Sequence, residues 1–118
     1  MSIEMHSKIE IIKKEIEKAK GQRIIVEGKK DREALAKLGL RNVTSLEGKP
    51  LFKVIESVKT RELLILTDFD KKGKELYGRL KAGLAKKGVK VNDKLRNLLL
   101  KTKLSHIEGL YNYLRRNS

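Results

Sequence analysis

Two aspartates, Asp68 and Asp70, stand one residue apart directly after the most apolar segment of the chain, "LLILT" at residues 63–67. A third carboxylate, Glu27, follows another apolar segment, "RIIV" at residues 23–26. Carboxylates that converge in one cleft raise each other's pKa unless a cation neutralises them. Oxygen ligands without cysteine or histidine suit Mg²⁺ or Mn²⁺. We therefore expect Asp68, Asp70 and Glu27 to hold a divalent metal ion; the competing interpretation is that each acid caps a helix or is solvated in a loop.

Basic residues follow both acidic positions, and they suggest that such a metal ion would also contact a phosphate group. A metal that bridges protein carboxylates and a phosphate is the usual arrangement for phosphodiester chemistry. Lysine and arginine side chains next to it would hold the nucleic-acid backbone, although plain solvent exposure is the alternative. The residues that we predict to contact nucleic acid are Lys29, Lys30, Lys71, Lys72, Lys74 and Arg79.

The charge distribution supports a polyanionic partner. The formal net charge of the 118 residues is +14, and residues 71–103 alone hold 12 Lys and Arg against 2 Asp and Glu. Positive charge of this kind attracts nucleic acid, although a lysine-rich solubilising surface is the competing explanation. Aromatic residues make up only 4% of the chain, so base stacking is poorly supplied and recognition should be directed at phosphates.

The elements that must position these residues alternate along the chain. Apolar residues at helical spacing or in short β-branched runs distinguish helices from strands. Helices are expected at residues 3–19, 29–39, 51–59, 72–87 and 94–101, with a last amphipathic helix from Ile107 onwards. Strands are expected at residues 23–27, 42–46, 63–67 and 89–91. This alternation predicts a parallel sheet covered on both faces, whose ligands bind outside the carboxyl ends of the strands.

Taken together, "IIVEGKKDREAL" at residues 24–35 and "LLILTDFDKKGKEL" at residues 63–76 resemble the Toprim domain family, most closely its small primase-like and 5S-ribosomal-RNA-maturase-like members. The resemblance implies a three-layer α/β/α, Rossmann-like fold with a roughly four-stranded, mainly parallel sheet. It also implies one domain over residues 1–118, with the family motifs in residues 23–91 and flanking helices at 3–19 and 93–116.

By this resemblance, Asp68 and Asp70 would bind Mg²⁺ (or Mn²⁺), and Glu27 would act as a general acid/base or as a further ligand. Topoisomerases of the family carry another acid two residues after the second aspartate, where this chain has Lys72, which argues against a second metal site. The expected function is a Mg²⁺-dependent protein that binds RNA or DNA and acts as an endonuclease or other phosphodiester-processing enzyme. The alternative is a non-catalytic nucleic-acid-binding or adaptor subunit of a larger processing complex; hydrolysis of a small phosphate ester is a third possibility.

Four further residues are candidates for support around the metal: Asp31, Gly28, Gly73 and Glu108. Asp31 is more simply a helix cap. His106 precedes Glu108, and a histidine near an acid could support catalysis. The simpler interpretation of this segment is a helix start, with Ser105 as the cap and Glu108 at the capping-box position.

The remaining composition bounds the location of the protein. There is no cysteine, the N-terminal residues contain acids and no apolar signal region, and no apolar run approaches the roughly 20 residues that a membrane span needs. We therefore expect a cytoplasmic protein that does not enter a membrane.

Overall fold

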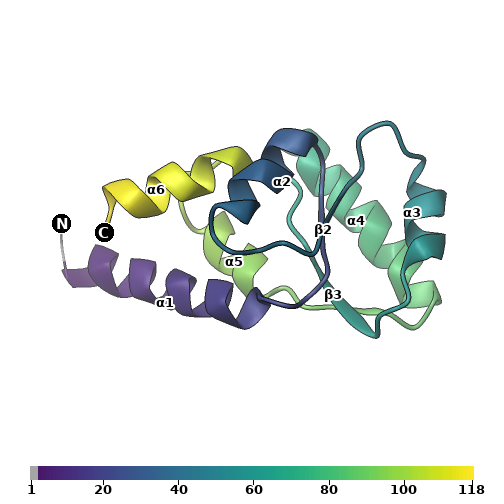
Figure 1. The fold of residues 1–118 in the computed structure, drawn as a ribbon, viewed down its shortest axis with the longest axis horizontal. Coiled ribbons are helices and arrows are strands. Elements are labelled where there is room, and N and C mark those ends of the chain that lie inside the picture. The colour runs from purple at the N-terminus through teal and green to yellow at the C-terminus, as the bar shows by residue number, and fades with distance from the viewer. Residues whose placement is uncertain (1–2) are drawn as a thin grey trace.

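A computed structural model describes residues 3–118 and has the expected α/β architecture (Figure 1). Helices and strands alternate as the sequence predicts, in the order α1 (Ile3–Ala19), β1 (Ile24–Val26), α2 (Lys29–Ala36), β2 (Val43–Ser45), α3 (Leu51–Ser57), β3 (Glu62–Ile65), α4 (Lys71–Lys86), β4 (Lys90–Val91), α5 (Lys94–Leu100), the 3₁₀ turn η1 (Ile107–Gly109) and α6 (Leu110–Arg116). The last predicted helix therefore begins as a 3₁₀ turn. Within the described residues, no helix is long and apolar enough to cross a membrane.

The four strands form one sheet in the order β2-β1-β3-β4, and every pairing in it is parallel. Each parallel connection needs a crossover, and the helices provide it. β1 lies between β2 and β3, with Ile25 opposite both Thr44 and Ile65. The carboxyl ends of β1 and β3 are therefore adjacent, which is the condition under which Glu27 and the two aspartates can meet.

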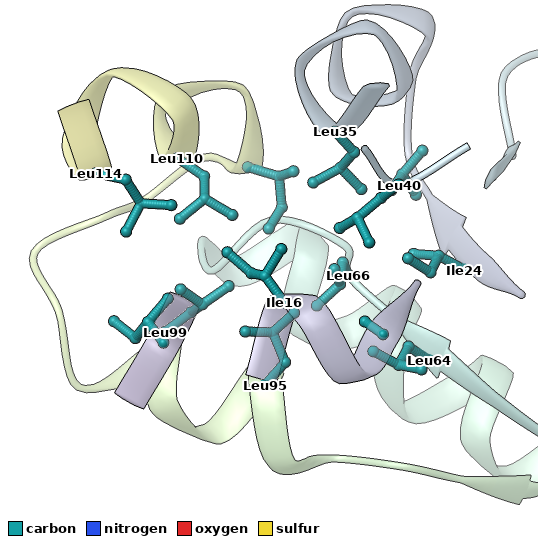
Figure 2. Close-up of a cluster of buried hydrophobic side chains, with 14 of the residues drawn as sticks. Ile16, Ile24, Leu35, Leu40, Leu64, Leu66, Leu95, Leu99, Leu110 and Leu114 are labelled. Carbon is teal, nitrogen blue, oxygen red and sulfur yellow. The ribbon is translucent and has the colours of Figure 1, made fainter. Parts of the chain in front are cut away.

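Alternate residues of the central strands face opposite layers, as the period of two requires. Ile24 and Leu64 contribute to a core with α1, α2, α5 and α6, whereas Ile25 and Ile65 contribute to a core with α3 and α4. Figure 2 shows the first of these cores, in which leucines from α2, α5 and α6 surround Ile16 of α1. Both faces of the sheet are thus covered, which confirms the three-layer arrangement and explains why the strands are continuous apolar runs.

The molecule is elongated, with principal extents of 43 × 24 × 23 Å. In Figure 1, α1 and α6 lie at one end and α3 and α4 at the other, with the sheet between them. The first core holds α1, α5 and α6 against β1 and β3. This packing brings the segment before α6 to the carboxyl edge of the sheet.

Candidate metal centre

Glu27 and Asp68 meet where β1 and β3 end. The strand ladder continues to Leu66, whose backbone N–H donates to Ile25 O at 2.8 Å. Two residues further on, the backbone N–H of Asp68 donates to Glu27 Oε2 at 2.7 Å. The Glu27 side chain therefore extends the hydrogen bonding of the sheet beyond the last strand residue. The predicted neighbourhood of these two acids follows from the pairing of β1 with β3.

Burial and neighbouring carboxyl groups shift the pKa of Glu27. Burial raises the pKa of the Glu27 carboxyl, and the nearby carboxyl of Asp68 raises it further. The hydrogen bond from the Asp68 backbone N–H acts in the opposite direction, but the net shift of the pKa is upward. A bound cation would relieve this repulsion and return the carboxyls to their ionised form.

One carboxylate oxygen of Asp70 caps a helix, and the other faces His106. Its Oδ1 accepts a hydrogen bond from the backbone N–H of Gly73 at 2.8 Å, which makes Asp70 the N-cap of α4. Its Oδ2 lies 3.6 Å from His106 Nε2. The cap that we considered as an alternative to metal binding is therefore present, and it leaves the second oxygen available.

Asp68, Asp70 and His106 each offer a ligand atom, and these atoms all lie within 4.8 Å of one another. Two carboxylate oxygens and an imidazole nitrogen are donors that a divalent metal accepts, so the residues present fit such an ion. Glu27 contacts Asp68 and is not part of this group. The structure therefore brings both predicted aspartates together, places Glu27 beside them, and adds His106, which the sequence interpretation assigned to a helix start.

The segment around His106 differs from the predicted capping box. The N-cap of the 3₁₀ turn is His106, no side chain caps it, and Ser105 Oγ instead lies 2.8 Å from His106 Nδ1. The reason is that the backbone N–H of Ile107 has another acceptor, Asp68 Oδ1 at 2.8 Å. Phe69 N–H also donates to Ser105 O at 2.9 Å. Two hydrogen bonds thus fasten residues 105–107 to the acidic loop.

Gly73 is required by the close approach of α4 to the acidic loop. A Cβ at this position would lie 2.0 Å from the carbonyl oxygen of Asp68 and 2.4 Å from its carbonyl carbon. The carbonyl of Gly73 in turn accepts a hydrogen bond from Thr67 Oγ1 at 2.7 Å. Gly73, which we had expected to support the site, therefore sets the distance between the first turn of α4 and Asp68.

Arg96 of α5 fixes the other side of the acidic loop, and the sequence interpretation did not single it out. It is 3% exposed and donates to the carbonyls of Thr67 at 2.7 Å and Asp68 at 3.2 Å. Its guanidinium lies over the rings of Phe69 and Tyr77. Burial lowers the pKa of Arg96, and nearby acids and Tyr77 oppose that shift. This arginine was counted in the basic surplus, but it is internal and unavailable to a nucleic acid.

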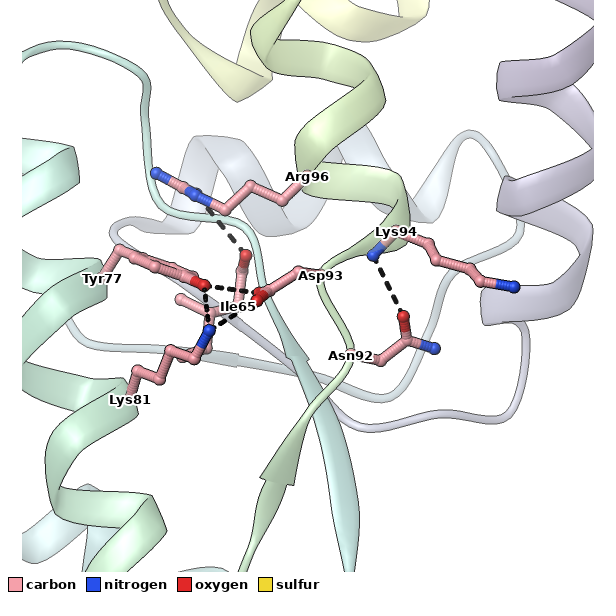
Figure 3. A network of polar contacts seen from close by, with 7 residues as sticks. All are labelled: Ile65, Tyr77, Lys81, Asn92, Asp93, Lys94 and Arg96. Atoms are coloured by element: carbon pink, nitrogen blue, oxygen red, sulfur yellow. Dashed lines mark hydrogen bonds and ion pairs between the residues drawn. The ribbon is translucent and has the colours of Figure 1, made fainter.

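A polar network extends from Arg96 towards solvent (Figure 3). Tyr77 O–H donates to Asp93 Oδ1, and Lys81 Nζ lies 2.6 Å from Asp93 Oδ2. Just before α5, Asn92 Oδ1 accepts a hydrogen bond from Lys94 N–H at 3.1 Å, and Asp93 is the N-cap residue of the helix. Asp93 makes no cap bond because its carboxylate serves Tyr77 and Lys81. The network holds α4 and α5 together behind the acidic loop.

Glu27 and Asp68 lie in an open cleft of about 550 Å³ at the carboxyl edge of the sheet, whereas Asp70 does not line it. The cleft is lined by Glu27, Gly28, Lys29, Lys30, Asp31, Glu47, Asp68, Lys72, His106 and Glu108. Three of the predicted nucleic-acid contacts therefore face the acids. The other three, Lys71, Lys74 and Arg79, are exposed on α4 but do not line the cleft.

Three further acids lie near the group formed by Asp68, Asp70 and His106 but do not belong to it. Asp31 Oδ2 accepts from Gly28 N–H at 3.0 Å, as expected of a cap, and burial raises its pKa. Glu108 lines the cleft. Glu47, which the sequence interpretation missed, accepts from Lys29 N–H at 3.1 Å. Its position just after β2 is the signal that would have found it, since the carboxyl ends of all strands face the ligand edge.

Comparison with known proteins gives a consistent result. The Toprim domain profile matches residues 22–94. A UPF0292 protein of Methanocaldococcus jannaschii is 31% identical over 113 residues, covering 90% of this chain and 88% of the relative. A UPF0292 protein of Pyrococcus horikoshii is 36% identical over 121 residues, covering 98% and 91%.

A solved structure has the same fold. It is described as a putative protein from Aquifex aeolicus, has a TM-score of 0.72 and 33% identity, and the match covers 87% of this chain and 94% of that one. The acid pair, the glutamate on the neighbouring strand and these similarities lead to one conclusion: the chain belongs to the Toprim domain family, whose members bind divalent metal and process nucleic acids, and its relatives include archaeal UPF0292 proteins.

Proposed function

We propose that this protein is an enzyme that uses a divalent ion, Mg²⁺ or Mn²⁺, to cleave or otherwise process phosphodiester bonds in RNA or DNA. The observation that carries the proposal is the convergence of Asp68 with Asp70 and with Glu27, where Asp68 and Glu27 line a cleft that is also lined by lysines. A metal ion between carboxylates and phosphate is the recurrent arrangement for phosphodiester chemistry.

Each acid has a separate task in this proposal. Asp68 and Asp70 would hold the ion, which when bound polarises a phosphate oxygen and stabilises the charge that develops on it. Glu27 would transfer a proton at the attacking or leaving oxygen. The hydrogen bond from the Asp68 backbone N–H to Glu27 Oε2 supports this role, because it holds the Glu27 carboxylate next to a residue that would bind the ion.

The backbone of the substrate would be positioned by the basic side chains around the cleft. Lys29, Lys30 and Lys72 line the cleft, and Lys71, Lys74 and Arg79 extend the positive surface along α4. Lysines of this kind neutralise phosphates without reading bases. Binding should therefore tolerate changes of sequence and weaken steeply as salt concentration rises.

The test is a cleavage assay on structured RNA, single-stranded DNA and duplex DNA, with Mg²⁺, Mn²⁺ or EDTA. Asp68→Asn and Glu27→Gln should abolish cleavage. The control is Glu56→Gln, which changes an exposed acid on α3, a helix on the sheet face opposite α1, and should leave cleavage unchanged. Cleavage that persists in EDTA or in both variants would refute the proposal. Salt-sensitive binding without cleavage would instead support the alternative, a nucleic-acid-binding adaptor.

A further inference from the structure

We propose that His106 is itself a metal ligand and that it gives the site a preference for transition-metal ions such as Mn²⁺ over Mg²⁺. This inference rests on the proposed metal site at Asp68 and Asp70, and it adds a nitrogen donor to what the sequence predicts as an all-oxygen set. His106 lies outside residues 22–94, the part of the chain that matches the Toprim domain.

The backbone on both sides of His106 is anchored to the loop that holds the aspartates. Ser105 O accepts from Phe69 N–H at 2.9 Å, and Ile107 N–H donates to Asp68 Oδ1 at 2.8 Å. Ile107 is also fully buried in the first core. The histidine between these two anchors is therefore held against the acidic loop by the fold itself, which is the pre-organisation that a metal ligand requires.

The distance from the ring to the carboxylate suits a shared ion. His106 Nε2 and Asp70 Oδ2 are 3.6 Å apart, which is too long for a hydrogen bond. Metal–ligand distances of about 2.1 Å place neighbouring ligand atoms roughly 3–3.5 Å apart around one ion. A small closure around a bound ion would satisfy both groups. The His106 side chain is 54% exposed, so an ion can reach it from solvent.

The second ring nitrogen has the partner that metal-bound histidines usually have. Nδ1 lies 2.8 Å from Ser105 Oγ. When Nδ1–H donates to that hydroxyl, the lone pair of Nε2 is directed at the aspartates. Such an outer hydrogen bond fixes both the tautomer and the ring orientation of a ligating histidine. The Ser105 hydroxyl, which does not cap the 3₁₀ turn, acquires a role in this way.

The chemistry of the donor set predicts the metal preference. Imidazole nitrogen is bound by divalent first-row transition metals with an affinity that rises from Mn²⁺ towards Cu²⁺, whereas Mg²⁺ prefers oxygen ligands and keeps much of its water. Loss of His106 should therefore weaken binding of Mn²⁺ by about tenfold or more and change binding of Mg²⁺ little. The two ions differ in this response because the imidazole nitrogen of His106 strengthens the binding of Mn²⁺ but not that of Mg²⁺.

Calorimetric titration of the purified full chain with Mn²⁺ and with Mg²⁺ tests the proposal, using His106→Ala and the control His6→Ala. His6, the other histidine of the sequence, is exposed on α1. We expect His106→Ala to lower the affinity for Mn²⁺ selectively and His6→Ala to change neither affinity. Circular dichroism and urea unfolding establish that both variants are folded.

A long-range ¹H–¹⁵N spectrum of the histidine rings with diamagnetic Zn²⁺ gives an independent readout. We expect the Nε2 resonance of His106 to shift and both resonances of His6 to stay unchanged. An unshifted His106 would refute its role as a ligand, and an equal loss of affinity for Mn²⁺ and Mg²⁺ in His106→Ala would refute the metal preference; both results leave the metal site in place. Absence of metal binding in the unmodified protein, with Asp68→Asn indistinguishable from it, would refute the proposed function as well.

Discussion

Gly73→Ala should damage both stability and metal binding, because the added methyl group has no space. The new Cβ would lie 2.4 Å from the carbonyl carbon of Asp68 and 2.8 Å from its Cα, whereas carbon atoms in ordinary contact are about 3.5–4.0 Å apart. The first turn of α4 and the acidic loop must therefore separate by about 1 Å. That movement disturbs Asp68 and the cap bond from Gly73 N–H to Asp70 at the same time.

The free energy of unfolding can be estimated from two opposing contributions. Alanine in a helix is favoured over glycine by roughly 0.5–1 kcal/mol. Overpacking against a backbone typically costs about 1–3 kcal/mol. We expect a net destabilisation of about 1–2 kcal/mol in urea unfolding, together with a clear loss of Mn²⁺ affinity in calorimetry, because a ligand displaced by an ångström no longer meets the ion.

Gly78→Ala provides the matched control on the same helix. Apart from its chain neighbours and the nearby backbone of α4, nothing lies within 4 Å of a Cβ at Gly78, so this variant should gain the helix propensity without the clash and keep its metal affinity. The reasoning is refuted if Gly73→Ala is as stable as Gly78→Ala and binds Mn²⁺ equally well. A loss of stability without any loss of metal affinity would show that Gly73 serves the helix packing alone.

Three further predictions concern the groups around the acidic loop. Arg96→Met leaves the carbonyls of Thr67 and Asp68 without their donor and should lower the urea midpoint by an amount equivalent to about 2–3 kcal/mol; an unchanged midpoint would contradict the positioning role. Tyr77→Phe keeps the ring but removes the hydroxyl bound to Asp93, and should cost about 0.5–1.5 kcal/mol in the same assay, with no cost expected if that bond is absent in solution. Glu27→Gln tests the raised pKa of the Glu27 carboxyl. The folded wild type binds the carboxyl proton more tightly than the unfolded chain does. The stability that this proton contributes is therefore present below the ordinary pKa of 4.5 and is lost as pH rises through the raised pKa. The variant should therefore gain stability relative to wild type between acidic and neutral pH in EDTA, and a constant difference across that range would contradict the shift.

The central part of the site was predictable because it depends on local rules. Strand ends, the period of two and the parallel order of the sheet place Asp68 beside Glu27, and each of these features has a signature in residue type. The N-cap role of Asp70 is equally local, since Gly73 lies three residues further along. These contacts require only that each segment adopts its intrinsic structure and that β1 pairs with β3.

The parts that the sequence did not indicate depend on contacts without such a signature. The anchoring of residues 105–107 uses backbone groups, and its bond from Ile107 to Asp68 spans 39 residues. Arg96 was missed for a different reason: arginine is rarely buried, and only the carbonyls and rings around it make its burial tolerable. Neither arrangement can be inferred before the packing of α5 and η1 on the sheet is known.

The strand order has a consequence for folding kinetics. Among the strands of residues 3–118 no two form a hairpin, so every pairing requires the closure of a long loop, and the pairing of β1 with β3 must enclose α2, β2 and α3. Such non-local pairings are slow, because the entropy of closure is lost before the contacts form. The bond between Glu27 and Asp68, which spans 41 residues, completes that same closure. Formation of this bond therefore marks the point in refolding at which the ends of the two central strands have come together.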